Sequence, residues 1–194
     1  EICACLVGSE MCIRDRNKND VVTGDIGCYT LGCAEPLNCM DSVVCMGAGF
    51  SAGMGIAKSF EKEGVTGKVV FGVVGDSTFF HSGMTGAAEI VYNKGRMIPC
   101  VLDNRITGMT GHQDNPVTGV TLMKDVTTAV DIRTLVLGCG VKPENVRTVD
   151  PYDLKAAAAV VKEAYEAEDL FVVIVRQPCA LLKSVIAHRK GQHC

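Results

Sequence analysis

Short apolar runs alternate along the chain with longer segments that are amphipathic or rich in glycine. Runs with the length of a strand cover residues 21–23, 42–46, 69–74, 98–102, 146–149 and 171–175. Segments with the length and spacing of helices cover residues 47–62, 82–93, 131–137 and 151–168. Runs that are apolar at nearly every position are typical of strands covered on both faces. The pattern therefore predicts an α/β fold, a doubly wound, mostly parallel sheet with helices on both faces.

The two ends of the chain depart from this pattern. Residues 1–16 (EICACLVGSEMCIRDR) have no clean periodicity and resemble translated sequencing-adapter read-through, so we predict a non-native leader there. Residues 183–194 are basic and are predicted to form a loose tail. Residues 17–182 are then expected to fold as one domain of ordinary size, and the chain is expected to be a fragment.

Composition narrows the class of protein further. The 194 residues are 47% hydrophobic and 21% charged, which indicates a globular chain. The net charge of −3 and the lack of a basic stripe argue against nucleic acid as a partner, and no apolar run approaches the ~20 residues of a membrane helix. Eleven cysteines without a C-x-x-C pair favour a reducing, cytoplasmic location and an anaerobic source.

Polar residues follow two of the predicted strands at the point where each strand ends. Gly75-Asp76-Ser77 comes directly after the run 69–74, and Asn104 follows the run 98–102 after one residue. Open parallel sheets bind ligands at this edge. A carboxylate and an amide supply oxygen ligands for a hard cation such as Mg²⁺, and the carbonyl of Ile106 is a third candidate ligand. The alternative for Asp76 is an aspartate that only caps the following helix.

Two further features allow more than one interpretation. Gly47-Ala48-Gly49 followed by Gly53 is close to the dinucleotide-binding fingerprint, since it follows a strand and opens a helix. Small residues that pack a helix tightly on a sheet explain the same glycines at least as well. His81 lies just after the Gly-Asp-Ser turn and is a candidate acid/base group, although a histidine that caps a helix is the commoner explanation.

Several segments together resemble one enzyme family. Gly75-Asp76-Ser77 and Asn104 resemble the diphosphate-and-metal motif of thiamine diphosphate enzymes, with Ser77 in place of the usual glycine. Residues 24–32 (GDIGCYTLG), 75–83 (GDSTFFHSG) and 109–113 (MTGHQ) are similar to segments of the indolepyruvate:ferredoxin oxidoreductase alpha-subunit family. The likeness runs from about residue 21 to residue 182.

This resemblance implies a C-terminal, diphosphate-type domain that binds thiamine diphosphate and Mg²⁺. It implies that the side chains of Asp76 and Asn104 and the carbonyl of Ile106 hold the metal. The activating glutamate of the family belongs to a separate pyrimidine-binding domain, which is expected to precede residue 21. The cofactor-binding residues that the family pattern implies are Gly27, Cys28, Met46, Gly47, Gly75, Asp76, Ser77, Thr78, Asn104, Thr107 and Gly108.

The resemblance also implies a reaction and its partners. In this family an aryl pyruvate is oxidatively decarboxylated to an acyl-CoA, and the electrons pass through iron–sulfur clusters to ferredoxin. The cofactor supplies the organic chemistry, and the protein binds and orients it. The implied partners are the pyrimidine-binding domain, a beta subunit, ferredoxin and the 2-oxoacid substrate. The tail 183–194 would then lead toward an iron–sulfur domain.

Other functions remain open at this point. Non-redox thiamine diphosphate decarboxylases and acetolactate-synthase-like carboligases share the same motif. A nicotinamide dehydrogenase built on Gly47-Ala48-Gly49 is a different class, and it would leave Asn104 without a role. A domain that binds the cofactor without turning over substrate is the fourth possibility.

Overall fold

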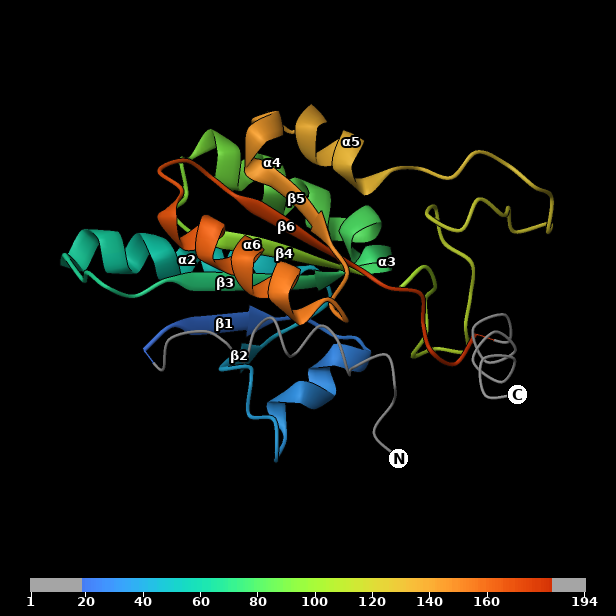
Figure 1. Cartoon of the computed structure of the whole chain (residues 1–194), viewed down its shortest axis with the longest axis horizontal. Coiled ribbons are helices and arrows are strands. Elements are labelled where there is room, and N and C mark those ends of the chain that lie inside the picture. Colours follow the sequence, from blue (N-terminus) through green and yellow to red (C-terminus); the bar gives the residue numbers. More distant parts are fainter. Residues whose placement is uncertain (1–18, 183–194) are drawn as a thin grey trace.

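The computed structural model describes residues 19–182, which form one six-stranded sheet with helices around it (Figure 1). All pairings between the named strands are parallel, and the order across the sheet is β2-β1-β3-β4-β6-β5. The strands are β1 (Val21–Gly24), β2 (Ser42–Val43), β3 (Val70–Gly75), β4 (Ile98–Asp103), β5 (Val146–Val149) and β6 (Val172–Arg176).

Helices cover both faces of this sheet, so the core has two layers. In one layer, apolar side chains of α2 (Ala48–Glu63), α4 (Met84–Tyr92) and α5 (Ile132–Gly138) pack on the sheet. In the other layer, α6 (Leu154–Glu166) and the 3₁₀ helix η1 (Cys28–Cys33) do so, and α6 crosses in front of the sheet in Figure 1. The central strands β3 and β4 are buried along their whole length. The predicted doubly wound parallel fold is confirmed.

The connections diverge between β1 and β3. The chain leaves β1 toward β2 at one edge of the sheet, whereas it leaves β3 toward β4 on the other side. Ligands of doubly wound sheets bind in the crevice that such a divergence opens at the carboxyl ends of the strands. The short helix α3 (Asp76–Thr78) begins at this crevice, directly after β3.

The predicted strand 42–46 is wrong in length. β2 ends at Val43, and Val44 is largely exposed at the edge of the sheet. The chain turns here, with the N–H of Ala48 donating to the carbonyl of Cys45 at 3.0 Å. Gly47 then takes the left-handed conformation (φ 87°) that starts α2. The apolar run is therefore longer than the strand, because its last residues form a turn.

Two of the predicted helices have different boundaries in the structure. The predicted helix 151–168 begins later, because the Asp153 carboxylate caps it by accepting the N–H of Ala156 at 3.0 Å, and it ends at Glu166. The helix predicted over residues 82–93 is the end of a longer helical run. That run starts at Asp76, passes through a π-helical turn η2 (Phe79–Gly83) and continues as α4.

Within the described part of the chain, no helix is both long and apolar enough to cross a membrane. The predicted leader 1–16 and tail 183–194 lie outside the described residues. The short 3₁₀ helix η3 (Pro143–Asn145) precedes β5 and is the remaining helical element of residues 19–182.

Candidate functional site

Asp76 is a buried carboxylate at the carboxyl end of β3, with only 3% of its surface exposed. Its Oδ1 accepts the N–H of Ser77 at 2.7 Å, whereas its Oδ2 has no hydrogen-bond partner among residues 19–182. Burial raises the pKa of Asp76 from 3.8 to about 7, with the N–H of Ser77 opposing the shift and the negative charge of Asp103 adding to it.

Asp103, which ends β4, differs from Asp76 because its charge is compensated. Its side chain is fully buried and forms ion pairs with Arg176 at 2.7 Å and Arg105 at 3.4 Å. Asp76 has no such cation beside it in the described residues, so the pocket retains one uncompensated buried carboxylate oxygen. Such a group is costly unless a cation or a proton neutralises it. The donor chemistry therefore fits a bound divalent metal ion.

Asn104 follows Asp103 on the neighbouring strand, and its turn is closed by its own side chain. Leu102 of β4 pairs with Gly75 of β3, so the two strand ends lie side by side. Asn104 Oδ1 accepts the N–H of Ile106 at 3.1 Å. Arg105 between them has the left-handed conformation (φ 62°), which bends the chain sharply. An amide oxygen can accept one further interaction, so Asn104 stays available as a ligand.

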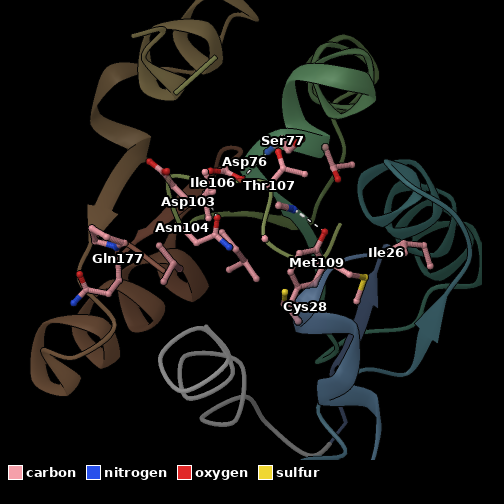
Figure 2. A pocket seen from close by; sticks show the side chains of 18 of the residues that line it. Ile26, Cys28, Asp76, Ser77, Asp103, Asn104, Ile106, Thr107, Met109 and Gln177 are labelled. Carbon is pink, nitrogen blue, oxygen red and sulfur yellow. Dashed lines mark hydrogen bonds between the residues drawn. The ribbon is translucent and has the colours of Figure 1, made fainter. Parts of the chain in front are cut away.

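One cavity of about 120 Å³ connects these strand ends. Figure 2 shows Asp76, Asn104 and Ile106 gathered on one side of it, with Cys28 and Met109 along another wall. The predicted site residues that line the cavity are Gly27, Cys28, Met46, Gly75, Asp76, Ser77, Thr78, Asn104, Ile106, Thr107 and Gly108.

Two predicted residues do not line this cavity. Gly47 is buried behind it, and its N–H donates to Asp25 Oδ2 at 2.9 Å. His81 is exposed on the π-helical turn, where its Nδ1 lies 3.2 Å from the hydroxyl of Ser82. The structure therefore brings eleven of the predicted residues together but leaves His81 outside, and its acid/base role stays a prediction.

The glycines of the dinucleotide-like segment serve packing. A Cβ at Gly49 would lie 2.1 Å from the carbonyl oxygen of Val73, and a Cβ at Gly53 would lie 2.7 Å from the Thr23 hydroxyl oxygen. Neither glycine lines the cavity. The interpretation of these glycines as a close helix–sheet contact is the one that the geometry supports.

Sequence reasoning missed a buried pair, Asp25 and Tyr29, of which Tyr29 lines the cavity and Asp25 lies behind it. The Tyr29 hydroxyl donates to Asp25 Oδ1 and accepts the N–H of Gly75 at 2.8 Å. Burial raises the pKa of Asp25 from 3.8 to about 6, and the hydrogen bond from Tyr29 opposes this shift. One signal was available, because Gly24-Asp25 repeats the Gly-Asp pair found after β3. Residues 24–32 entered the sequence analysis only as a segment similar to the family, and Asp25 and Tyr29 had no predicted role of their own.

The cavity also has lining residues that were not among the predicted site residues, from the loop after β4 and from beyond the ends of the last two strands. Met109 and Thr110 come from the loop closed by the Thr107–Gln113 bridge. Tyr152 and Gln177 lie beyond the carboxyl ends of β5 and β6. Only the three-dimensional order β4-β6-β5 brings these late residues next to Asn104.

Sequence comparison identifies a family and several relatives. Residues 25–175 match the family "Thiamine pyrophosphate enzyme, C-terminal TPP binding domain". Over 93% of its length the chain is 40% identical to the indolepyruvate oxidoreductase subunit IorA of Archaeoglobus fulgidus, covering 28% of that protein. It is 38% identical over 88% of its length to the IorA of Thermococcus kodakarensis, covering 27% of it. The chain thus spans little more than a quarter of these curated relatives.

Structure comparison gives the same fold at lower sequence identity. The 2-oxoglutarate:ferredoxin oxidoreductase of Magnetococcus marinus superposes with a TM-score of 0.67 at 17% identity, over 93% of this chain and 62% of that one. Benzoylformate decarboxylase of Polynucleobacter necessarius superposes with a TM-score of 0.65 at 17% identity, over 87% of this chain and 32% of that one. These similarities support the α/β fold and do not discriminate between reactions.

Proposed function

Because the chain belongs to the thiamine pyrophosphate enzyme family as its C-terminal cofactor-binding domain, we propose that it binds thiamine diphosphate through Mg²⁺ within a 2-oxoacid:ferredoxin oxidoreductase. The single observation that carries the metal assignment is the buried, unpartnered Oδ2 of Asp76 at the end of β3. A divalent cation there would neutralise both this carboxylate and a diphosphate group.

The residues around Asp76 divide into metal ligands and diphosphate contacts. Asp76 Oδ2, Asn104 Oδ1 and the carbonyl of Ile106 are the proposed protein ligands, and a Mg²⁺ ion commonly completes its shell with phosphate and water oxygens. Ser77 and Thr78 begin a helical run, where the Ser77 hydroxyl and the N–H of Thr78 suit a diphosphate, while the N–H of Ser77 donates to Asp76 Oδ1. When bound, thiamine diphosphate would supply the carbanion chemistry at the keto carbon of the substrate.

For Gly75 we propose a role other than the diphosphate contact that the resemblance implies. Its N–H already donates to the Tyr29 hydroxyl, so this N–H is not free for a diphosphate oxygen. Gly75 instead leaves room: a Cβ there would lie 3.0 Å from the Tyr29 ring. We propose that Gly75 shapes the turn, and that the residues after it contact the cofactor.

The substrate and the partners follow from the relatives. The curated proteins that match most of this chain are named as indolepyruvate oxidoreductase subunits. These names favour an aryl 2-oxoacid as the substrate, and an oxidative decarboxylation over a non-redox decarboxylation. Iron–sulfur clusters, coenzyme A, ferredoxin and a beta subunit would then act with the complete subunit in the cytoplasm.

Three apolar residues at the cavity mouth, Ile26, Met46 and Met109, are about 40–50% exposed. That apolar rim suits coverage by a pyrimidine-binding domain.

A melting experiment tests the cofactor assignment. We expect Mg²⁺ and thiamine diphosphate together to raise the melting temperature of this chain, because they bind only the folded state. Asp76→Asn should abolish the shift, since an uncharged amide replaces the proposed carboxylate ligand. Asp125→Asn, an exposed position outside the cavity, is the matched control and should keep the shift.

Two results would contradict the proposal. One is a wild-type chain that gains no stability from the two ligands together at millimolar concentration. The other is an Asp76→Asn variant that responds as strongly as the wild type, which would remove Asp76 from the metal site. A response to NAD without metal would instead support the dehydrogenase alternative.

A further inference from the structure

A carboxylate–tyrosine pair lies behind the proposed cofactor turn and ties three loops together. Asp25 is fully buried and Tyr29 is 9% exposed. The Tyr29 hydroxyl donates to Asp25 Oδ1 and accepts the N–H of Gly75 at 2.8 Å. Asp25 Oδ2 accepts the N–H of Gly47 at 2.9 Å. The turns that follow β1, β2 and β3 therefore meet on two side chains.

The Tyr29 ring fits into space that two glycines leave for it. A Cβ at Gly27 would lie 2.3 Å from Tyr29 Cε1, and a Cβ at Gly75 would lie 3.0 Å from the same atom. Contacts below 3 Å are not tolerated by a real Cβ, so a side chain at Gly27 would displace the ring. Thr30 fixes the same loop, because its hydroxyl donates to the carbonyl of Asp25 at 2.7 Å. The ring position is thus set by its surroundings.

The position of Asp76 depends on this arrangement. Gly75 precedes Asp76 directly, and its N–H is held by the Tyr29 hydroxyl. Mg²⁺ demands near-ideal octahedral geometry, so a small displacement of a ligand weakens its binding. Groups that orient metal ligands without touching the metal commonly change metal affinity 10–100-fold when removed.

We propose that Asp25 and Tyr29 are positioning residues, which hold the turns after β1, β2 and β3 in the arrangement that binds Mg²⁺ and thiamine diphosphate. This inference rests on the proposed function and names what sets the geometry of its site. Tyr29 lines the cavity and Asp25 does not, so the effect of Asp25 on the cofactor is transmitted through Tyr29 and Gly47.

The opposite edge of the sheet provides a matched control pair. The Tyr165 hydroxyl donates to Asp20 Oδ2, and Asp20 Oδ1 accepts the N–H of Val69 at 2.8 Å. Asp20 precedes β1 and Val69 precedes β3, so this pair joins the same two strands at their amino ends. Tyr165→Phe therefore removes a hydrogen bond of the same chemistry, at the edge opposite the strand ends that line the cavity.

The test compares Tyr29→Phe with Tyr165→Phe in this chain. We expect both variants to melt at a lower temperature than the wild type, because each loses a hydrogen bond to a buried carboxylate. Only Tyr29→Phe should weaken thiamine diphosphate binding in the presence of Mg²⁺, by about tenfold in calorimetry, while Tyr165→Phe should stay within about twofold. Amide hydrogen exchange of residues 75–78, measured without ligand, should accelerate only in Tyr29→Phe. Asp25→Asn, which keeps an acceptor for Tyr29 but not for Gly47, should give an intermediate affinity.

The outcomes separate this inference from the proposed function. Unchanged affinity in Tyr29→Phe, or an equal loss in Tyr165→Phe, overturns the positioning role. If the wild-type chain binds no thiamine diphosphate, the proposed function fails, and hydrogen exchange still decides the inference. Equal protection of residues 75–78 from hydrogen exchange in Tyr29→Phe and Tyr165→Phe then overturns the positioning role. If Tyr29→Phe does not fold, Asp25→Asn is compared with the wild type, and equal protection in these two chains overturns the positioning role as well.

Discussion

Asp76 shows at the scale of one residue how a binding site opposes stability. A buried carboxylate with an unpartnered oxygen destabilises the metal-free fold, which is why its pKa rises to about 7. Proteins retain such groups where a ligand compensates for them, and replacing them often stabilises the protein at the expense of function. The same atom is therefore expected to limit stability without metal and to provide affinity with it.

Asp76→Asn should consequently raise the melting temperature of the metal-free chain. At pH 8 the wild-type carboxylate is mostly ionised, and the amide removes that buried charge while its oxygen can still accept the N–H of Ser77. Each kcal/mol gained corresponds to roughly 2–4 °C for a chain of this size. Differential scanning calorimetry in EDTA measures the change. A melting temperature that falls would show that another group already neutralises Asp76.

The raised pKa of Asp25 predicts that the stability of the chain depends on pH even when no metal is bound. Its folded pKa of about 6 lies above the ordinary value of 3.8, so the folded chain holds this proton more tightly than the unfolded chain. The resulting stabilisation is complete below about pH 4 and is lost as the pH rises through about 6. It amounts to about 2–3 kcal/mol at most.

Urea titrations between pH 4 and pH 8 in EDTA measure this contribution. The free energy of unfolding of the wild type minus that of Asp25→Asn should decrease as the pH rises across this window. The difference between the two chains cancels the contribution of Asp76, which has the same sign. A difference that is independent of pH would mean that Asp25 stays ionised throughout.

The predicted site residues that lie together in the cavity have short-range signals. Asp76 and Asn104 are small polar residues directly after apolar strands, and parallel pairing brings such strand ends together. Tyr29 carries no comparable signal, because its partner Gly75 is 46 positions away. The ion pair between Asp103 and Arg176 spans 73 positions. Contacts of this kind depend on the order of strands, which periodicity does not specify.

At the scale of elements, α2 and β3 approach each other closely. Thr23 donates to the carbonyl of Gly49 at 2.6 Å, and a Cβ at Gly72 would lie 2.8 Å from the same carbonyl oxygen. Gly49 and Gly72 thus let helix and strand backbones approach each other directly. This approach fixes where α2 begins, immediately after the turn that contains Gly47.

Gly49→Ala should therefore destabilise the fold although alanine favours helices. The new Cβ would meet the Val73 carbonyl oxygen at 2.1 Å, and overpacking of this kind costs about 1–3 kcal/mol or more. Gly55→Ala in the same helix is the matched control, because its Cβ would point into open space. It should stabilise by about 0.4–1 kcal/mol. Chemical denaturation of both variants checks the opposite signs, and equal effects would refute the packing role.

Element existence was predictable here, whereas element boundaries depended on local hydrogen bonds. Every predicted strand exists, and the signal is strongest for β3, β4 and β6, because strands buried on both faces leave continuous apolar runs. The run at 42–46 misled because Val44 is apolar yet exposed at an edge. The helix start at Asp153 was missed because Asp150 and Asp153 offer equally good caps in the sequence. In the fold, Asp150 instead accepts the N–H of Tyr152 at 2.9 Å.

At the scale of the whole molecule, the cavity carries the residues that we propose bind the cofactor, and none that we assign to its activation. No glutamate is among the residues that line it in the described chain. The family resemblance places the activating glutamate on a pyrimidine-binding domain. The half-exposed Met46 and Met109 at the mouth are positions that such a domain would cover.

Binding and turnover should therefore separate in this chain. We expect it to bind thiamine diphosphate and Mg²⁺ but to release no carbon dioxide from indolepyruvate, even with coenzyme A and an electron acceptor present. Binding must be verified in the same sample by the melting shift, because an empty site would give the same negative result. The intact indolepyruvate oxidoreductase of Archaeoglobus fulgidus is the positive control. The opposite result would be carbon dioxide release by the chain alone that disappears in the Asp76→Asn variant. It would show that the group that activates the cofactor lies within these 194 residues. His81, exposed one turn beyond the proposed diphosphate contacts, would then be the first residue to replace.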